Sequence, residues 1–552
     1  MMKVTRGAVA EPQTSLAYLT GSWRVDKPIH VLQNAPCHVA CPAGEDPRAY
    51  LALVDQGKME KAWRVLVAAN PMPAITGRVC PHPCEQGCNR QHYDSPLAIH
   101  AVERILGDLA ITHEWSYDLE PLSKDAPKVA VVGAGPAGIS CAYQLRRLGM
   151  APVLFEAEDV PGGLLTTAIP PYRLPRDVLK NELRRILALD IDFRPLQRLG
   201  RDFTLDGLCQ DYAAVFLGLG LGRSREWSVQ GATPANLHDA LSLLREWHLI
   251  GKVPVAKRVA IIGGGNTAID LARIMKFSGC EEVHVITHYA IPGEGEDPMQ
   301  AFAREVHQAI EEGVIIHPYR GVARLVFHGD DLKGIEMVHM RRIMTDHGSA
   351  RMPFEGTESI LEVDMVIPAV GETIEPTGIA SLLDTHGKMK ANYWGKVDHM
   401  PVWVGGDLHP QSVGYVSEAI GFGRRAAQSI AAFLGNIEEL QKPSDQSVAY
   451  DHLNVHYFEP AKRVDINFLP PAERRPDREI EGGITPERAS EEAKRCFCCG
   501  DCLDCNNCWT LCPDEAVLYK DHADYVFDYD YCKGCGICAT ECPTGYIKMT
   551  EE

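Results

Sequence analysis

The chain has 552 residues, which is enough for several domains of ordinary size. Its 55 Lys and Arg residues against 74 Asp and Glu residues leave a net charge of −19, so neither nucleic acid nor an anionic membrane surface is an expected partner. The opening MMKVTRGAVAEPQTS lacks the apolar core of a signal peptide, and no apolar run approaches the ~18 residues of a membrane span. We therefore expect a cytoplasmic enzyme whose 19 cysteines serve metal or redox chemistry rather than disulfides.

A strand, a glycine turn and a helix predict the first dinucleotide-binding domain. In KVAVVGAGPAG (128–138), a buried strand leads into a turn with Gly133, Gly135 and Gly138, which opens a helix. Such a turn brings backbone N–H groups and the helix N-terminus to a pyrophosphate. Glu156 ends the next strand, where a carboxylate accepts hydrogen bonds from ribose hydroxyls. A glycine turn alone also serves backbone geometry, so the prediction depends on the whole unit.

The same order of strand, turn and helix recurs in KRVAIIGGGNTA (257–268), which predicts a second nucleotide-binding domain. Its turn contains Gly263, Gly265 and Ala268. The strand that follows ends in THY (287–289), which offers neither an acid for a free ribose nor an arginine for a 2′-phosphate. The motif therefore leaves the choice of nucleotide open, and we expect NADH to be used at least as well as NADPH.

A third strand and turn, VWVGGDLHP (402–410), precedes a long helix and contains Asp407. A loop aspartate on its own is usually a cap or a turn residue. Together with the upstream dinucleotide turn, however, Asp407 resembles the second flavin motif of two-dinucleotide flavoproteins, in which such a residue binds the ribityl or pyrophosphate part of FAD. We therefore expect one FAD per chain, and residues 378–436 return to the first nucleotide domain.

The spacing of the C-terminal cysteines is the strongest indication of a cofactor in the chain, and it indicates iron–sulfur clusters. Near the C-terminus, the run C-x2-C-x2-C-x3-C-P occurs twice, as in bacterial ferredoxins with two 4Fe–4S clusters. Each run gives three thiolates to one cluster and its fourth to the other, whereas structural zinc needs only four ligands and no crossed pattern. The first cluster is predicted to use Cys502, Cys505, Cys508 and Cys542, and the second Cys532, Cys535, Cys538 and Cys512.

Several motifs in combination carry a resemblance to a known family. They are GAGPAG, PGGLL with Gly163, IPPYRLP, GGGNTAIDLAR, IPAVGETIEP and GGD, together with the N-terminal cysteines. This set, over about residues 30–436, resembles the NAD(P)H-dependent FAD and iron–sulfur module shared by the glutamate synthase small subunit and the N-terminal half of dihydropyrimidine dehydrogenase. The chain departs from that family twice. It has no arginine pair at His288 and Tyr289, and it has no C-x-x-C shortly before Cys37.

The resemblance implies two further clusters in the N-terminal region, which need eight ligands. Five are Cys37, Cys41, Cys80, Cys84 and Cys88, and a non-cysteine ligand of the family matches Glu103. In RCFCCG (495–500), Cys496 and Cys499 are similar to the missing C-x-x-C, so we predict that the C-terminal arm folds back onto the N-terminal domain. One cluster would then use Cys37, Cys88, Cys496 and Cys499, and the other Cys41, Cys80, Cys84 and Glu103. The alternative is that Cys496 and Cys499 are free thiols and the N-terminal domain holds one cluster.

The predicted architecture is multidomain. A helical iron–sulfur domain (1–125) precedes two doubly wound α/β domains, for FAD (126–249 and 378–436) and NAD(P) (250–377), and a connecting arm (437–490) leads to a ferredoxin-like α+β domain (491–552).

The resemblance implies an oxidoreductase that moves electrons between NAD(H), with NADP(H) as the alternative, and four 4Fe–4S clusters through FAD. We name no acid or base residue. We expect a ferredoxin or protein redox partner and a hetero-oligomer, such as a 2-oxoacid:ferredoxin oxidoreductase or an aromatic-ring reductase. The alternatives are a glutamate synthase small subunit and a non-enzymatic cluster scaffold or redox sensor.

Overall fold

The computed structural model describes residues 19–231, 237–345, 348–437, 440, 442–521 and 523–552. The chain forms two compact units. The first contains Met1–Tyr117, Leu440–Ile466 and Gly483–Glu552, and the second contains Asp118–Glu439 and Asn467–Gly482. In the described part of the chain, none of the helices has both the length and the apolar composition that crossing a membrane requires.

The N-terminal part of the first unit is built from short helices, which are α1 (Pro36–Ala40), α2 (Pro47–Asp55), α3 (Met59–Val67), α4 (Pro73–Val79), α5 (Pro83–Gln86) and α6 (Ile99–Thr112). Four of them begin with proline, whose fixed φ and missing N–H suit the first turn of a helix. Helices α4 and α6 approach closely, because a Cβ on Gly107 would stand 2.2 Å from the backbone nitrogen of Ala74. The cysteines of this region therefore sit at helix ends on a closely packed frame.

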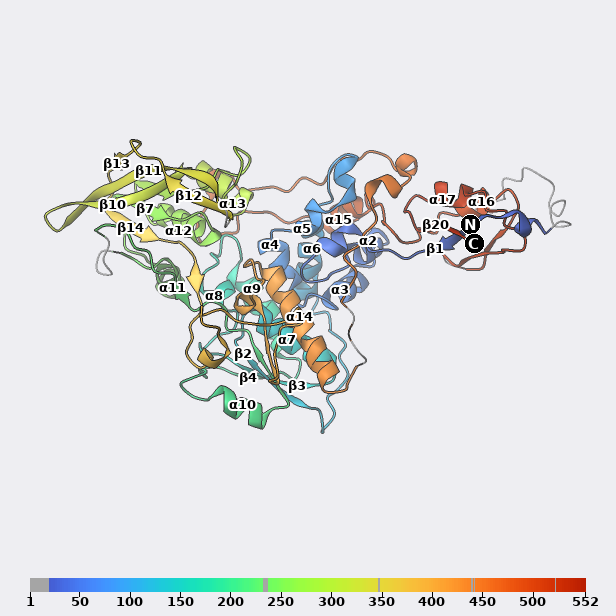
Figure 1. Cartoon of the computed structure of the whole chain (residues 1–552), viewed down its shortest axis with the longest axis horizontal. Helices are drawn as coiled ribbons and strands as arrows, with labels where there is room; N and C mark the ends of the chain where they lie inside the picture. The colour runs from blue at the N-terminus through green and yellow to red at the C-terminus, as the bar shows by residue number, and fades with distance from the viewer. Residues whose placement is uncertain (1–18, 232–236, 346–347, 438–439, 441, 522) are drawn as a thin grey trace. The chain divides into compact units, whose positions relative to one another are not determined.

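The first unit also contains the ferredoxin domain, and both ends of the described chain meet in it. Strand β1 (Asp26–His30) pairs antiparallel with the last strand, β20 (Ile547–Glu551), as Figure 1 shows. A second pair joins β18 (Val517–Tyr519) to β19 (Tyr525–Phe527), and the short helices are α16 (Asn507–Thr510) and α17 (Ile537–Thr540). The arm contributes helix α15 (Pro486–Ala493), which packs on α2 and α6.

The second unit contains a six-stranded sheet in the order β16-β17-β5-β2-β3-β4. Its strands are β2 (Lys128–Val132), β3 (Ala151–Phe155), β4 (Asp192–Arg194), β5 (Ala214–Leu217), β16 (Lys396–Val397) and β17 (Val402–Val404), all parallel except β16. Helix α7 (Pro136–Arg147) follows the first glycine turn, and the 3₁₀ turn η4 (Gly406–Leu408) leads to α14 (Val416–Phe433), which packs on α7. Strands β16 and β17, which come late in the chain, thus join the sheet that β2 begins.

A second parallel sheet has the order β14-β7-β8-β9, with β7 (Arg258–Ile262), β8 (Glu282–Ile286), β9 (Val314–His317) and β14 (Met365–Pro368). Its helices include α12 (Asn266–Phe277), after the second glycine turn, and α13 (Ala303–Glu311). Between β9 and β14 the chain forms an antiparallel sheet of β10 (Arg320–His328), β11 (Asp331–Thr345), β12 (Gly348–Pro353) and β13 (Ser359–Leu361). The central strands β2 and β7 are buried runs of Val, Ile and Ala, as is typical of parallel strands covered on both faces.

Candidate functional site

The first glycine turn lies between β2 and α7. A Cβ on Gly133 would stand 2.4 Å from a backbone carbonyl oxygen, and a Cβ on Gly138 would stand 1.8 Å from the carbonyl oxygen of Gly133, so neither position admits a side chain. A Cβ on Gly135, in contrast, would meet nothing within 4 Å. Glu156 directs its carboxylate at the turn and accepts a hydrogen bond of 2.7 Å from the backbone N–H of Ala134. The turn is thus open at the N-terminus of α7, where a pyrophosphate fits.

Two further segments border this turn. A Cβ on Gly163 would stand 3.1 Å from the Cα of Gly135, so the PGGLL loop passes directly beside the open position. A Cβ on Gly406 would stand 3.0 Å from the Cβ of Ala137, which brings η4 against the first turn of α7. Asp407 follows in η4, and burial raises the pKa of its carboxyl group. Residues far apart in the sequence therefore surround one place that suits FAD.

The second glycine turn repeats this geometry between β7 and α12. A Cβ on Gly263 would stand 2.1 Å from the carbonyl oxygen of Ala369, whereas a Cβ on Gly265 would meet nothing within 4 Å. Ala268 is fully buried in α12. The turn again leaves an open helix N-terminus, which fits the pyrophosphate of a nicotinamide nucleotide.

Four of the predicted ligands meet where the C-terminal arm contacts the N-terminal helices. Cys37, Cys88, Cys496 and Cys499 all line one cavity. Burial raises the pKa of the Cys37 thiol well above its usual range, and the charged forms of Cys496, Cys88 and Cys499 raise it further, in that order. To hold a cluster, these four thiols would have to be deprotonated, because the thiolate is the form that binds iron.

The N-terminal helices hold the backbone of this arm segment directly. Arg48 donates a hydrogen bond of 2.9 Å to the carbonyl oxygen of Cys499, and Arg90 donates one of 2.8 Å to the carbonyl oxygen of Arg495. The side-chain amide of Asn89 lies 3.5 Å from the Cys499 sulfur, the distance of an N–H···S hydrogen bond. Similar bonds to sulfur are typical of iron–sulfur sites, so the donor set suits a cluster.

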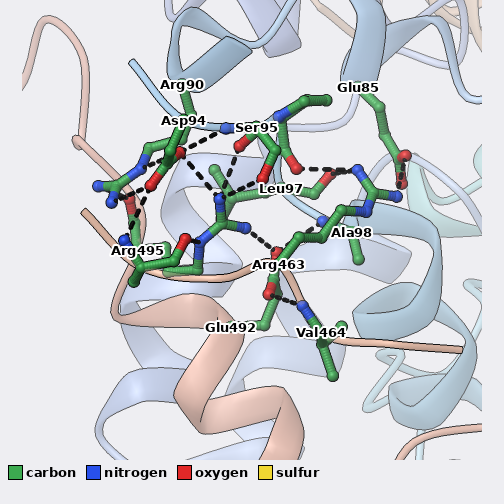
Figure 2. Close-up of polar contacts among 12 residues, drawn as sticks. Glu85, Arg90, Asp94, Ser95, Leu97, Ala98, Arg463, Val464, Glu492 and Arg495 are labelled. Carbon is green, nitrogen blue, oxygen red and sulfur yellow. Dashed lines mark hydrogen bonds and ion pairs between the residues drawn. The ribbon is translucent and has the colours of Figure 1, made fainter.

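A polar network next to these cysteines joins the arm to the loop before α6 (Figure 2). Arg495 contacts the carboxylate of Asp94 at 3.0 Å and that of Glu492 at 2.6 Å. Glu492 in turn accepts hydrogen bonds of 2.8 Å from the backbone N–H groups of Ala98 and Val464. The side chains of Arg495 and Glu492 are only 3% and 1% exposed, so their charges are stabilised by these partners rather than by water.

The remaining N-terminal candidates form a second group around α4 and α6. The pKa of Cys41 is raised by burial and by the nearby charges of Glu45, Cys80 and Glu103, and that of Cys84 by burial, Cys41, Glu85 and Cys80. Glu103 is only 3% exposed, although a helix glutamate is usually solvated. Asn70 donates hydrogen bonds to both carboxylates, at 2.8 Å to Glu45 and 3.0 Å to Glu103. Sequence reasoning missed Glu45, whose position in the PAGEDP loop carries no spacing signal.

In the ferredoxin domain, the two cysteine runs cross. The pKa of Cys508 is raised to about 12 by burial, Cys505 and Cys502, and further by Cys538 and then Cys542 from the second run. Burial and Cys542 also raise the pKa of Cys505. The pKa of Cys538 is also raised to about 12, by burial, Cys532 and then Cys512 from the first run. Cys512, Cys532, Cys535 and Cys538 line a common cavity. The fourth cysteine of each run therefore lies with the first three of the other.

All 19 cysteines lie in the described part of the chain, and none forms a disulfide. Within the same residues, no group of three His, Cys, Asp or Glu side chains is close enough to hold a single metal ion.

Comparisons with known proteins extend over nearly the whole chain. Residues 127–423 match the family described as "Pyridine nucleotide-disulphide oxidoreductase". Residues 31–115 match dihydropyrimidine dehydrogenase domain II with its 4Fe–4S cluster, and residues 525–548 match a 4Fe–4S binding domain. The resemblance read from the motifs is confirmed by these matches.

Three curated relatives have similar sequences. The NADP(+)-dependent formate dehydrogenase subunit beta of Moorella thermoacetica is 33% identical over 538 residues, with 89% of this chain and 73% of that protein covered. The NADPH-Fe(3+) oxidoreductase subunit beta of Geobacter sulfurreducens is 31% identical, with 88% and 78% covered. The NADPH glutamate synthase small chain of Escherichia coli is 30% identical, with 73% and 89% covered. The chain therefore belongs to the pyridine nucleotide-disulphide oxidoreductase family, as an NAD(P)H-dependent FAD and iron–sulfur oxidoreductase.

Proposed function

We propose that this chain transfers electrons between NAD(H) and a protein partner through one FAD and four 4Fe–4S clusters. The observation that carries the proposal is the cavity lined by Cys37 and Cys88 of the N-terminal helices and by Cys496 and Cys499 of the arm. Cys496 and Cys499 would supply the two ligands that the N-terminal sequence lacks, which supports a cluster shared between segments more than 400 residues apart. NADP(H) is the alternative nucleotide.

The proposed ligand sets follow the four groups of side chains. The shared cluster uses Cys37, Cys88, Cys496 and Cys499, and the second N-terminal cluster uses Cys41, Cys80, Cys84 and Glu103. The ferredoxin clusters use Cys502, Cys505, Cys508 and Cys542, and Cys532, Cys535, Cys538 and Cys512. The shared cluster would join the arm to the N-terminal domain and give electrons a route toward the ferredoxin domain.

The two glycine turns would bind and orient the nucleotides that exchange a hydride. When bound, a flavin takes two electrons from a dihydronicotinamide as a hydride and releases them singly, as one-electron clusters require. The open positions at Gly135 and Gly265 would receive the pyrophosphates, while Glu156 and Asp407 would position FAD. This transfer needs no separate acid or base from the chain.

The partner is proposed to be a larger redox enzyme. Two relatives are named as beta subunits, which supports a hetero-oligomer in which this chain exchanges electrons with another subunit or a ferredoxin. A 2-oxoacid:ferredoxin oxidoreductase and an aromatic-ring reductase fit this chemistry. The glutamate synthase alternative is less favoured, because the alignment with that small chain covers 73% of this chain and the double ferredoxin run is an additional feature.

Iron content tests the proposal. The wild type should contain about sixteen iron atoms per FAD, and the Cys496→Ser/Cys499→Ser double variant about twelve. Cys498→Ser is the matched control, because Cys498 lies between these residues but belongs to none of the proposed sets, so its iron content should stay at about sixteen. About twelve atoms in both the wild type and the double variant would contradict the shared cluster. Failure of NADH and NADPH alike to reduce a viologen dye would contradict the electron-transfer function.

A further inference from the structure

The residues that follow β8 border the adenosine end of the second nucleotide site. In this fold, the end of the second strand approaches the ribose, where a carboxylate binds a free 2′-hydroxyl or an arginine binds a 2′-phosphate. A Cβ on Gly264 would stand 2.5 Å from Oγ1 of Thr287 and 3.2 Å from Cδ2 of Tyr289. These two side chains therefore pack directly against the glycine turn, where this fold would place the adenosine ribose.

The inserted antiparallel sheet brings an arginine to this place, although the sequence after β8 has none. Arg351 on β12 places Cζ of its guanidinium 4.0 Å from the ring centroid of Tyr289. The backbone next to this contact is held in place, because the backbone N–H of Arg320 at the start of β10 donates a hydrogen bond of 2.8 Å to the carbonyl oxygen of Thr287. Arg324, farther along β10, pairs with Glu336 instead.

The guanidinium of Arg351 already has an anionic partner. It forms an ion pair with Asp297, and the side chains of Arg351 and Asp297 are only 24% and 25% exposed. Asp297 belongs to a loop that also carries Glu294 and Glu296. His288 adds no positive charge at neutral pH, because burial and the nearby Arg351 both lower its pKa. The arginine that contacts Tyr289 is thus neutralised by Asp297, whose loop carries three carboxylates.

We propose that the Asp297–Arg351 ion pair makes the nicotinamide site selective for NAD(H) over NADP(H). The Asp297 carboxylate already pairs with the guanidinium that a 2′-phosphate would need. Its negative charge also repels a phosphate dianion placed beside it. A 2′-hydroxyl carries no charge and avoids this repulsion. The inference rests on the proposed function, which places a nicotinamide nucleotide at the second glycine turn.

Direct binding of nucleotide fragments to the purified full-length protein tests this selectivity without any turnover. The wild type should bind 5′-AMP at least as tightly as 2′,5′-ADP in calorimetry. In Asp297→Asn, affinity for 2′,5′-ADP should rise about tenfold or more, because the freed guanidinium gains a charge-assisted hydrogen bond to the phosphate. Asparagine is the suitable replacement, because Asp297 has a φ of +67° and asparagine tolerates this left-handed conformation. Affinity for 5′-AMP should change less than about twofold.

Two further variants separate the ion pair from the general acidity of the loop. The gain should disappear in Asp297→Asn/Arg351→Ala, which lacks the guanidinium. Glu294→Gln removes one charge from the same loop without touching the pair, so it should leave 2′,5′-ADP affinity unchanged. An equal gain in Glu294→Gln, or none in Asp297→Asn, would overturn the selectivity role while leaving the proposed function in place. Failure of the wild type to bind either fragment would overturn both.

Discussion

The guanidinium of Arg90 lies 4.7 Å from the ring centroid of Phe497, the residue that follows Cys496 in the arm. Arg90 also pairs with Asp94 at 2.7 Å, and its side chain is only 2% exposed. A buried cation from the N-terminal helices thus holds the arm beside two proposed cluster ligands. Protein contacts, and not iron alone, therefore keep the arm in place.

We expect Arg495→Ala to weaken the docking of the arm. Loss of this guanidinium leaves the carboxylate of Glu492, which is 1% exposed, without its ion-pair partner, at a cost of about 3 kcal/mol. The measurement is the urea midpoint followed by the visible absorbance of the clusters. Lys494→Ala is the matched control, because Lys494 is exposed and adjacent, and it should leave the midpoint unchanged. Equal midpoints in the two variants would contradict the role of the network.

Two glycine substitutions should separate flavin binding from folding. In Gly135→Val the added side chain points into open space, so the protein should fold normally but lose FAD, because the side chain would fill the place proposed for the pyrophosphate. In Gly138→Ala the Cβ would stand 1.8 Å from a carbonyl oxygen, so the turn itself should be destabilised. Acid extraction should yield one FAD per wild-type chain. FMN, or two flavins per chain, would contradict the single flavin site.

Substitutions at Glu103 and Glu45 form a matched pair that tests which carboxylate is a ligand of the second N-terminal cluster. Both carboxylates are buried and both accept a hydrogen bond from Asn70. We expect Glu103→Gln to lower iron by about four atoms per FAD, because the amide is a poor replacement for an anionic ligand. Glu45→Gln should retain the iron. The opposite result in iron assays and electron paramagnetic resonance would assign the ligand to Glu45.

Removal of iron should affect the two compact units differently. The proposed clusters all lie in the unit with residues Gly483–Glu552, whereas both glycine turns lie in the unit with Asp118–Glu439. Metal-stabilised domains lose structure without their metal. Oxidative removal of iron in the presence of a chelator should therefore make residues 483–552 sensitive to protease while FAD stays bound. The check is limited proteolysis with mass spectrometry, and concomitant loss of FAD would show that the flavin site depends on the clusters.

The sequence by itself determined the local chemistry. Gly133, Gly135 and Gly138 after a buried strand define a nucleotide turn, because backbone geometry at a turn depends on residues that are adjacent in the chain. The doubled cysteine run similarly predicts two clusters with crossed ligands, because the two runs lie within one short segment of the chain. Both kinds of motif are local, so their spacing alone carries the information.

Only the tertiary structure decided which distant segments meet. A helix glutamate is usually solvated, and the packing of α4 against α6 buries Glu103. No sequence spacing predicts the pairing of β1 with β20 or the contact of Arg351 with Tyr289. In each case the two partners lie far apart in the chain, and the number of residues between them does not determine whether they meet. Such contacts depend on how whole elements pack, and this packing places an arginine beside β8 where the local sequence offers none.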